Sequence, residues 1–215
     1  MDRSRLEAFS DGVFAVAITL LALNIVVKGP GHGALWGWKG QLWQLWPTFL
    51  SYLVSFFMIG IVWVNHHALV RTIKAVDRTL LFLNLVLLLF VVLIPFATTT
   101  VADYRLHDTW DGRVSVAVYA GVFLGMSIGF GSVFEWTLHG QRTHSPLPIE
   151  RHWPARIRFV GGAGVYLVAI GVSLLNTVAG FALIAAVAVY YIVERTPSPS
   201  PPVPDDEKVT PANQD

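Results

Sequence analysis

The stretch Arg5-Leu-Glu-Ala-Phe-Ser-Asp-Gly-Val-Phe-Ala-Val-Ala-Ile-Thr-Leu-Leu-Ala-Leu-Asn-Ile-Val-Val27 decides the fold. A helix crosses the apolar part of a bilayer with about 20 mostly apolar residues, and this run is long enough to do so. Because the run begins close to Met1 and no small-residue cleavage site clearly follows it, we interpret it as a retained span and not as a signal peptide. The run also carries Asp11, and a carboxylate inside a membrane span is costly unless a partner group meets it. Asp11 is therefore a candidate functional residue.

The composition indicates a membrane protein. Of the 215 residues, 54% are hydrophobic and 13% are charged, whereas about 25% of the residues in a soluble domain are charged. The eight Trp and six Tyr suit a protein with two membrane–water interfaces. The net charge of +1 gives no reason to expect a nucleic-acid partner. The absence of Cys excludes disulfides, thiolate metal ligands and cysteine nucleophiles.

Six segments are apolar and long enough, or nearly so, to be helical spans. They are Leu6–Val27, Pro47–Val70, Leu80–Ala102, Val114–Leu138, Ile157–Leu175 and Thr177–Val193. Because Asn176 alone separates the last two, they predict a tight helical hairpin. The predicted fold class is therefore an all-α membrane protein, with one six-span unit over residues 1–195. From residue 196 onward the chain is Pro-rich and polar, which predicts a disordered cytoplasmic tail over 196–215.

The distribution of Lys and Arg predicts the orientation of these spans. Alternation from the N-terminus puts eleven of them on one side: Arg3, Arg5, Arg71, Lys74, Arg78, Arg142, Arg151, Arg156, Arg158, Arg195 and Lys208. The other side carries four, namely Lys28, Lys39, Arg105 and Arg113. Because Lys and Arg are concentrated on the cytoplasmic side of membrane proteins, we expect both termini to lie in the cytoplasm and the chain to lie in the cell membrane.

This topology brings polar side chains from three spans to a similar depth. The candidates for one network are Ser10, Asp11, Trp63, Asn65, His66 or His67, and Asn84. Buried polar groups need partners in a medium of low dielectric constant, so we favour a structural network that ties the helices together. One alternative is a set of interfacial residues solvated by water, which we favour for Asn65. Another is a proton relay between Asp11 and a histidine, as in pumps.

The histidines do not indicate a metal site or an enzyme. Neighbouring residues on a helix point about 100° apart, so His66 and His67 cannot both bind one metal ion. No further histidine follows at the spacing that a helical zinc site uses. His139, His144 and His152 are irregularly spaced in a predicted cytoplasmic loop and are interpreted as solvated. We therefore predict no cofactor, no catalytic residue and no metal ion other than transient potassium in a pore.

The first span has two different faces. At 100° per residue, Thr19 lies within about 60° of Val16, whereas Asp11 lies about 140° away from it. The residues within about 40° of Val16 are Arg5, Phe9, Gly12, Leu20, Leu23 and Val27. Apart from Arg5 and Thr19, the face around Val16 is apolar. From the residues alone, this face would meet lipid or another helix.

The head of the first span resembles the transmembrane protein 175 family of potassium channels. The matching residues are Arg5, Phe9, Ser10 and Asp11, followed by Ala17-Ile-Thr-Leu-Leu21. Trp63-Val-Asn-His66-His67 is similar to the second-span pattern of that family, and Asn84 with Pro95-Phe96 is similar to its third-span pattern. The resemblance covers the six-span body, and its specific part is the first motif.

The resemblance implies a homotetramer with six transmembrane helices per subunit, around a central pore lined by the first helix. It implies that Val16, Thr19, Leu20 and Leu23 form the constriction and determine selectivity. Val16 departs from the family, which usually has a larger Ile or Leu there, and this could shift the tightest point to Leu20 or Leu23. The residues assigned by the resemblance to a structural network that faces away from the pore are Arg5, Phe9, Ser10, Asp11, Trp63, His66 or His67, and Asn84.

The predicted function is a passive, potassium-permeable cation channel with a hydrophobic constriction on its first helix. Its predicted partners are potassium ions, further copies of itself and the lipid bilayer. The alternative is a proton-coupled transporter or a proton leak that uses Asp11 with His66 or His67. Such transporters often contain inverted repeats, and the sequence contains no clear internal repeat.

Overall fold

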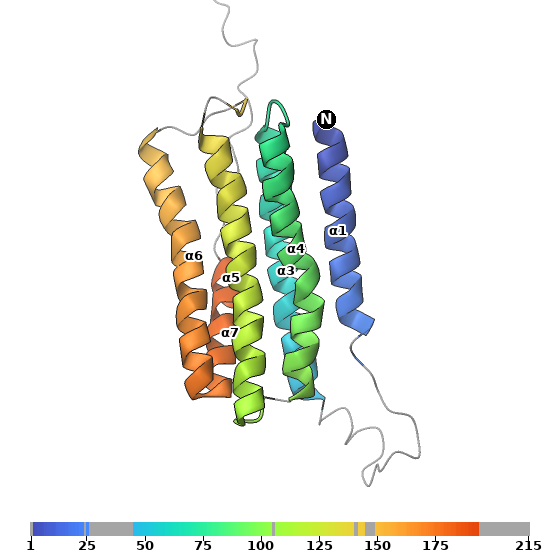
Figure 1. Ribbon diagram of the computed structural model, residues 1–215, viewed down its shortest axis with the longest axis vertical. Coiled ribbons are helices and arrows are strands. Elements are labelled where there is room, and N and C mark those ends of the chain that lie inside the picture. Colours follow the sequence, from blue (N-terminus) through green and yellow to red (C-terminus); the bar gives the residue numbers. More distant parts are fainter. Residues whose placement is uncertain are drawn as a thin grey trace, which may run out of the picture.

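The computed structural model describes residues 2–23, 25, 45–104, 106–139, 142–144 and 149–193. Within 149–160 it describes only the side chains of Trp153 and Arg156, and it leaves out that of Val193. Consecutive helices run in opposite directions in one bundle, with α1 at one edge (Figure 1). The six helices of this described part are α1 (Arg3–Leu23), α3 (Trp46–Thr72), α4 (Arg78–Asp103), α5 (Trp110–Leu138), α6 (Ile149–Leu175) and α7 (Thr177–Val193). The predicted all-α class is confirmed.

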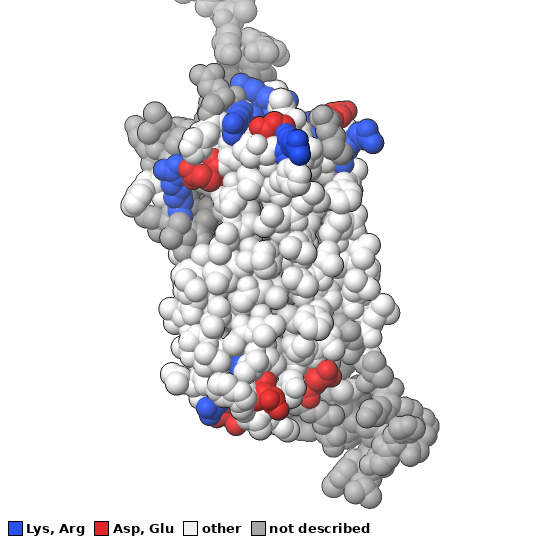
Figure 2. Space-filling model, viewed as in Figure 1, with Lys and Arg blue, Asp and Glu red and all other residues white. Residues whose placement is uncertain are grey.

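Four helices of the described chain (α1, α3, α4 and α5) are long and apolar enough to cross a membrane. The apolar parts of α6 and α7, Gly161–Leu175 and Thr177–Ile192, are shorter. Figure 2 shows charged side chains at the two ends of the bundle and an uncharged band between them. A bilayer has the same pattern, with an apolar layer between two polar ones.

Local sequence explains where several helices begin. The side chain of Asp77 precedes α4 and accepts a hydrogen bond from the backbone N–H of Leu80 at 2.7 Å. Thr109 does the same for Gly112 at the start of α5, at 3.1 Å. Such N-caps satisfy backbone donors that have no partner within the helix. Pro47 lies in the first turn of α3, where its missing N–H is not needed.

The predicted ends of three helices (α1, α5 and α6) are wrong by three residues or more, and α5 begins at Trp110 and not at Val114. α1 begins at Arg3 and not at Leu6, because the backbone oxygen of Asp2 accepts hydrogen bonds from the N–H groups of Arg5 and Leu6. It ends at Leu23, Ile25 is not helical, and Val27 lies outside the described residues. α6 begins at Ile149 and not at Ile157. The expected spans followed the apolar residues, whereas all three helices begin in polar sequence.

The start of α6 also changes the interpretation of the loop histidines. His152 lies within this helix and not in a loop. Near the start of α6, the side chain of Arg156 pairs with Glu135 of α5. Its Nε donates to Oε2 of Glu135 at 2.9 Å. This ion pair ties the polar start of α6 to its neighbour.

Two sets of contacts connect the loops at opposite ends of the bundle. At the end where Arg71, Lys74 and Arg142 lie, an antiparallel bridge joins Ile73 to Thr143, and the N–H of Lys74 donates to the backbone oxygen of Arg142 at 2.9 Å. We call this the Arg-rich end. The loop after α3 is thereby attached to the loop after α5.

At the opposite end, Asp108 connects the α4–α5 loop to the α6–α7 hairpin. Its carboxylate accepts two hydrogen bonds from Arg113, at 2.9 and 3.1 Å, and one from the backbone N–H of Thr177 at 3.2 Å. These donors, with Arg113 the main one, lower the pKa of Asp108 to about 2. The carboxylate therefore stays charged over the whole physiological range.

The core lies between the helices, and α4 and α5 approach each other closely. A Cβ added at Gly129 of α5 would lie 2.9 Å from the Cα of Leu87 in α4. The buried side chains of Phe14, Met58 and Phe123 connect α1, α3 and α5 in this core. Among the described helices, α1 packs against α3 and α4, so only part of its circumference faces the bundle.

Candidate functional site

A buried polar chain joins the first three described helices at a single depth. Nε2 of the His66 ring in α3 lies 2.8 Å from Oδ1 of Asn84 in α4. The Nδ2 group of Asn84 donates in turn to Oγ of Ser10 in α1 at 3.0 Å. All three residues are no more than 1% exposed. Because Oδ1 of an amide can only accept, this contact is a hydrogen bond in the His66 tautomer that carries a proton on Nε2.

A second group lies beside this chain and is partly exposed. The indole N–H of Trp63 donates to Oδ1 of Asp11 at 2.9 Å. Nδ1 of His67 lies 3.2 Å from Oε1 of Glu7 and 4.0 Å from Oδ2 of Asp11. We refer to Glu7, Asp11 and His67 as the acidic triad. One ligand atom from each lies within 4.8 Å of the other two, an arrangement that could hold a divalent cation or exchange protons.

The two histidines therefore have different surroundings. His66 lies in the buried chain, and its ring also packs against Phe14 with 5.4 Å between ring centroids. His67 lies in the acidic triad, and its ring centroid is 5.9 Å from that of Trp63. Asp11 itself is not the residue that bonds Asn84, because its neighbour Ser10 makes that contact.

Other candidates of the sequence analysis lie outside these two groups. The side chain of Asn65 donates to the backbone oxygen of Ile61 on its own helix at 2.9 Å, as expected for a residue without a role in the network. Arg5 and Phe9 are exposed on α1. Sequence reasoning missed Glu7, although Glu7 and Asp11 are four residues apart and a helix places such residues on one face.

The opposite face of α1 is exposed and apolar. The exposed fractions of Val16, Leu20 and Leu23 are 56%, 38% and 73%, and Thr19 is also exposed. The hydroxyl of Thr19 donates to the backbone oxygen of Val16 at 2.9 Å. This leaves the hydroxyl oxygen free to accept, so Thr19 can offer a lone pair to a cation.

Comparison with known proteins identifies relatives over nearly the whole chain. A family model described as "Endosomal/lysosomal potassium channel TMEM175" matches residues 5–95. A potassium channel of Streptomyces collinus is 39% identical over 93% of this chain and 96% of its own length. The human "Endosomal/lysosomal proton channel TMEM175" is 36% identical, over 68% of this chain and 30% of its own length.

A solved structure has the same fold. It is the crystal structure of a lysosomal potassium-selective channel TMEM175 homolog from Chamaesiphon minutus. The two chains superpose with a TM-score of 0.77 at 34% identity, over 89% of this chain and 96% of the other. The chain is a multi-pass membrane protein of an ion-channel family and not an enzyme. Sequence and fold agree that it belongs to the TMEM175 family.

Proposed function

We propose that this chain is a passive, potassium-permeable channel that assembles as a homotetramer around a pore lined by α1. The observation that carries the proposal is the exposed apolar face of α1, which lies opposite the residues that hold this helix to α3 and α4. In a closed ring of four subunits, each residue of that face becomes a ring of four side chains. The names of the prokaryotic relatives as potassium channels support the same assignment.

The constriction in this proposal consists of Val16, Thr19, Leu20 and Leu23. Rings of apolar side chains control conduction by dewetting, and a narrow apolar ring favours the ion that loses its water more readily. Potassium loses water more readily than sodium, so the selectivity is modest and needs no loop of backbone carbonyls. Thr19 supplies the polar oxygen at this level.

The network on the other side of α1 keeps the pore helix in position. Ser10 is fixed by Asn84, and Asp11 is fixed by Trp63, so the α1 face with Val16 points away from α3 and α4. In this proposal, residues 1–195 form the channel unit, both termini are cytoplasmic and the protein lies in the cell membrane. The proposed tail over 196–215 and Arg195 lie outside the described residues.

The test is a reversal potential measured with purified protein in liposomes under a potassium/sodium gradient, with the oligomer measured alongside. Leu20→Ala and Leu23→Ala widen the apolar rings, so conductance should rise and potassium selectivity should fall. Leu89→Ala is the matched control, because Leu89 is a leucine of α4 whose exposure lies between those of Leu20 and Leu23. Unchanged reversal potentials in both α1 variants, or an equal change in Leu89→Ala, would contradict the assignment of the pore to α1.

The acidic triad supports a second candidate function, a proton pathway. Three titratable groups lie within reach of one another near the start of α1, and animal relatives carry the name proton channel. In this version a proton passes between Glu7, Asp11 and His67, whereas His66 stays within its buried hydrogen bonds. His67→Gln removes the titratable ring and should abolish proton flux while potassium flux remains. Proton flux equal to that of the unmodified protein would exclude this pathway.

A further inference from the structure

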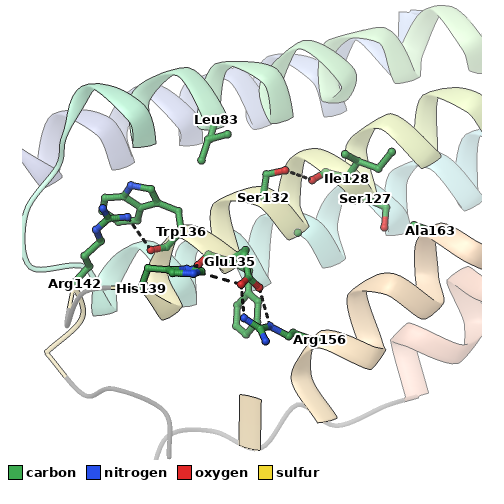
Figure 3. Close-up of a pocket in the computed structure, with 12 residues that line it drawn as sticks. Leu83, Ser127, Ile128, Ser132, Glu135, Trp136, His139, Arg142, Arg156 and Ala163 are labelled. Atoms are coloured by element: carbon green, nitrogen blue, oxygen red, sulfur yellow. Dashed lines mark hydrogen bonds and ion pairs between the residues drawn. The ribbon is translucent and has the colours of Figure 1, made fainter. Parts of the chain in front are cut away.

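A cavity of about 580 Å³ lies between α4, α5 and α6 at the Arg-rich end of the bundle. This volume is within the range of small-molecule sites, about 300–1,000 Å³. Figure 3 shows its two different ends. Arg142 and His139 lie toward one end, and Ser127, Ile128 and Ala163 lie toward the other.

Among the described residues, the charged end of the cavity carries more positive than negative charge. Arg156 forms a two-pronged ion pair with Glu135, which balances one charge of each sign. Arg142 is the second arginine, and its guanidinium lies over the ring of Trp136, 4.5 Å from the centroid. One of its N–H groups donates to the backbone oxygen of Trp136 at 3.3 Å. Because an arginine has five N–H donors, Arg142 can bind a further anionic oxygen.

Two more features prepare this end for a ligand. The ring of Trp136, on which the guanidinium of Arg142 lies, is itself buried in a core cluster, so this platform is fixed in place. The backbone of Arg142 is held by the N–H of Lys74, through the bridge that joins the two loops. Arg142 is thus held by its backbone and by its stacking on Trp136, so its side chain loses little conformational entropy when a ligand binds.

The other end of the cavity is mainly apolar, with Ser127 as a polar residue in its lining. Leu83 of α4, Ile128 of α5 and Ala163 of α6 line it. The hydroxyl of Ser132 already donates to the backbone oxygen of Ile128 at 2.8 Å. An apolar groove that runs along transmembrane helices and ends at an arginine fits a molecule with an acyl chain and an anionic headgroup.

We propose that this cavity binds an anionic phospholipid, whose phosphate contacts Arg142 and whose acyl chain lies along Leu83, Ile128 and Ala163. Basic pockets between transmembrane helices bind anionic lipid headgroups in this way. The level of the cavity agrees, because Arg142 follows the end of α5 and Trp136 belongs to its last turn, where tryptophans mark the membrane–water interface. Two other occupants are disfavoured. A soluble phosphate would make no use of the apolar walls of the cavity. A second subunit would have to bury the Glu135–Arg156 ion pair, which is costly.

The test measures lipid retention by the full-length protein in nanodiscs of phosphatidylcholine that contain a minor fraction of phosphatidylglycerol. Native mass spectrometry after extraction counts the phosphatidylglycerol that remains bound. Arg142→Gln removes the charge and one charge-assisted hydrogen bond, so retention should fall about tenfold. Ala163→Trp fills the apolar end, leaves every charge in place and should reduce retention as well. Arg71→Gln, an exposed arginine at the same end of the bundle, is the matched control and should retain the lipid.

Four results would overturn the proposal. The first is equal retention in Arg142→Gln and the unmodified protein, and the second is an equal loss in Arg71→Gln, which would indicate unspecific attraction by charge. The third is displacement of the lipid by inorganic phosphate alone, which would indicate a soluble ligand. The fourth is dissociation of subunits by Ala163→Trp, which would indicate that another copy of the chain fills the cavity. None of these readouts depends on ion conduction, so the proposal stands or fails independently of the channel assignment.

Discussion

The substitution Asn84→Ala tests the buried chain that joins α1, α3 and α4. It removes both hydrogen bonds of the amide, to Ser10 and from His66, and leaves two buried polar groups without a partner. Hydrogen bonds between membrane helices contribute about 0.6 kcal/mol on average and about 1.7 at most. Two of them therefore contribute about 1–3 kcal/mol in total, and we expect this loss in the free energy of unfolding.

Asn65→Ala is the matched control for this experiment. It makes the same chemical change on the neighbouring helix, but the amide of Asn65 bonds only its own helix at Ile61. Equilibrium unfolding in mixed micelles should show a clear loss for Asn84→Ala and a smaller one for Asn65→Ala. A double-mutant cycle with Ser10→Ala then isolates the coupling between α1 and α4. Equal losses in the two alanine variants, or no coupling in the cycle, would refute the reasoning.

Three further predictions concern other parts of the molecule. Asp108→Asn should reduce stability at neutral pH, and the difference from the unmodified protein should shrink as the pH falls toward 2. The interactions that lower the pKa of Asp108 stabilise the fold at pH values above the ordinary pKa of a carboxyl, about 4. This contribution is lost when the carboxylate is protonated, so a stability difference that does not change with pH would contradict the prediction. Gly180→Ala should destabilise the hairpin, because its Cβ would lie 2.6 Å from the Cα of Ser173, whereas Gly171→Ala meets open space and should be neutral or stabilising in thermal unfolding. Asp11→Ala should reduce the fraction of assembled protein in size-exclusion chromatography, because it removes the acceptor of Trp63; normal assembly with altered ion selectivity would assign Asp11 to the pore instead.

The sequence was sufficient to predict the class of the fold. Long apolar runs identify membrane helices, because a bilayer has no water to bond an irregular backbone. The same criterion misplaced the start of α6, since that helix continues into polar residues such as Arg156 that bond a neighbouring helix. Apolar length measures how much chain can lie in lipid and not where a helix ends.

The polar site was only partly accessible from the sequence. Helical spacing placed Ser10, Asn84 and the two histidines at a common depth, and the structure brings Ser10, His66 and Asn84 into contact. Which histidine faces Asn84 depends on the rotation of α3 about its axis, which its sequence did not determine. Glu7 was overlooked because it precedes the apolar part of α1, although its spacing from Asp11 was visible.

The central claim, that the face of α1 with Thr19 lines the pore, can be tested with single cysteines. The chain contains no cysteine, so each introduced thiol is the only one in the subunit. A charged, membrane-impermeant thiol reagent should block potassium current through Thr19→Cys, because that side chain meets the water-filled pore. The same reagent should leave current through Leu89→Cys unchanged, because the exposed Leu89 side chain of α4 lies outside the pore in this account. Undiminished current through Thr19→Cys, with its reaction confirmed by mass spectrometry, would contradict the account.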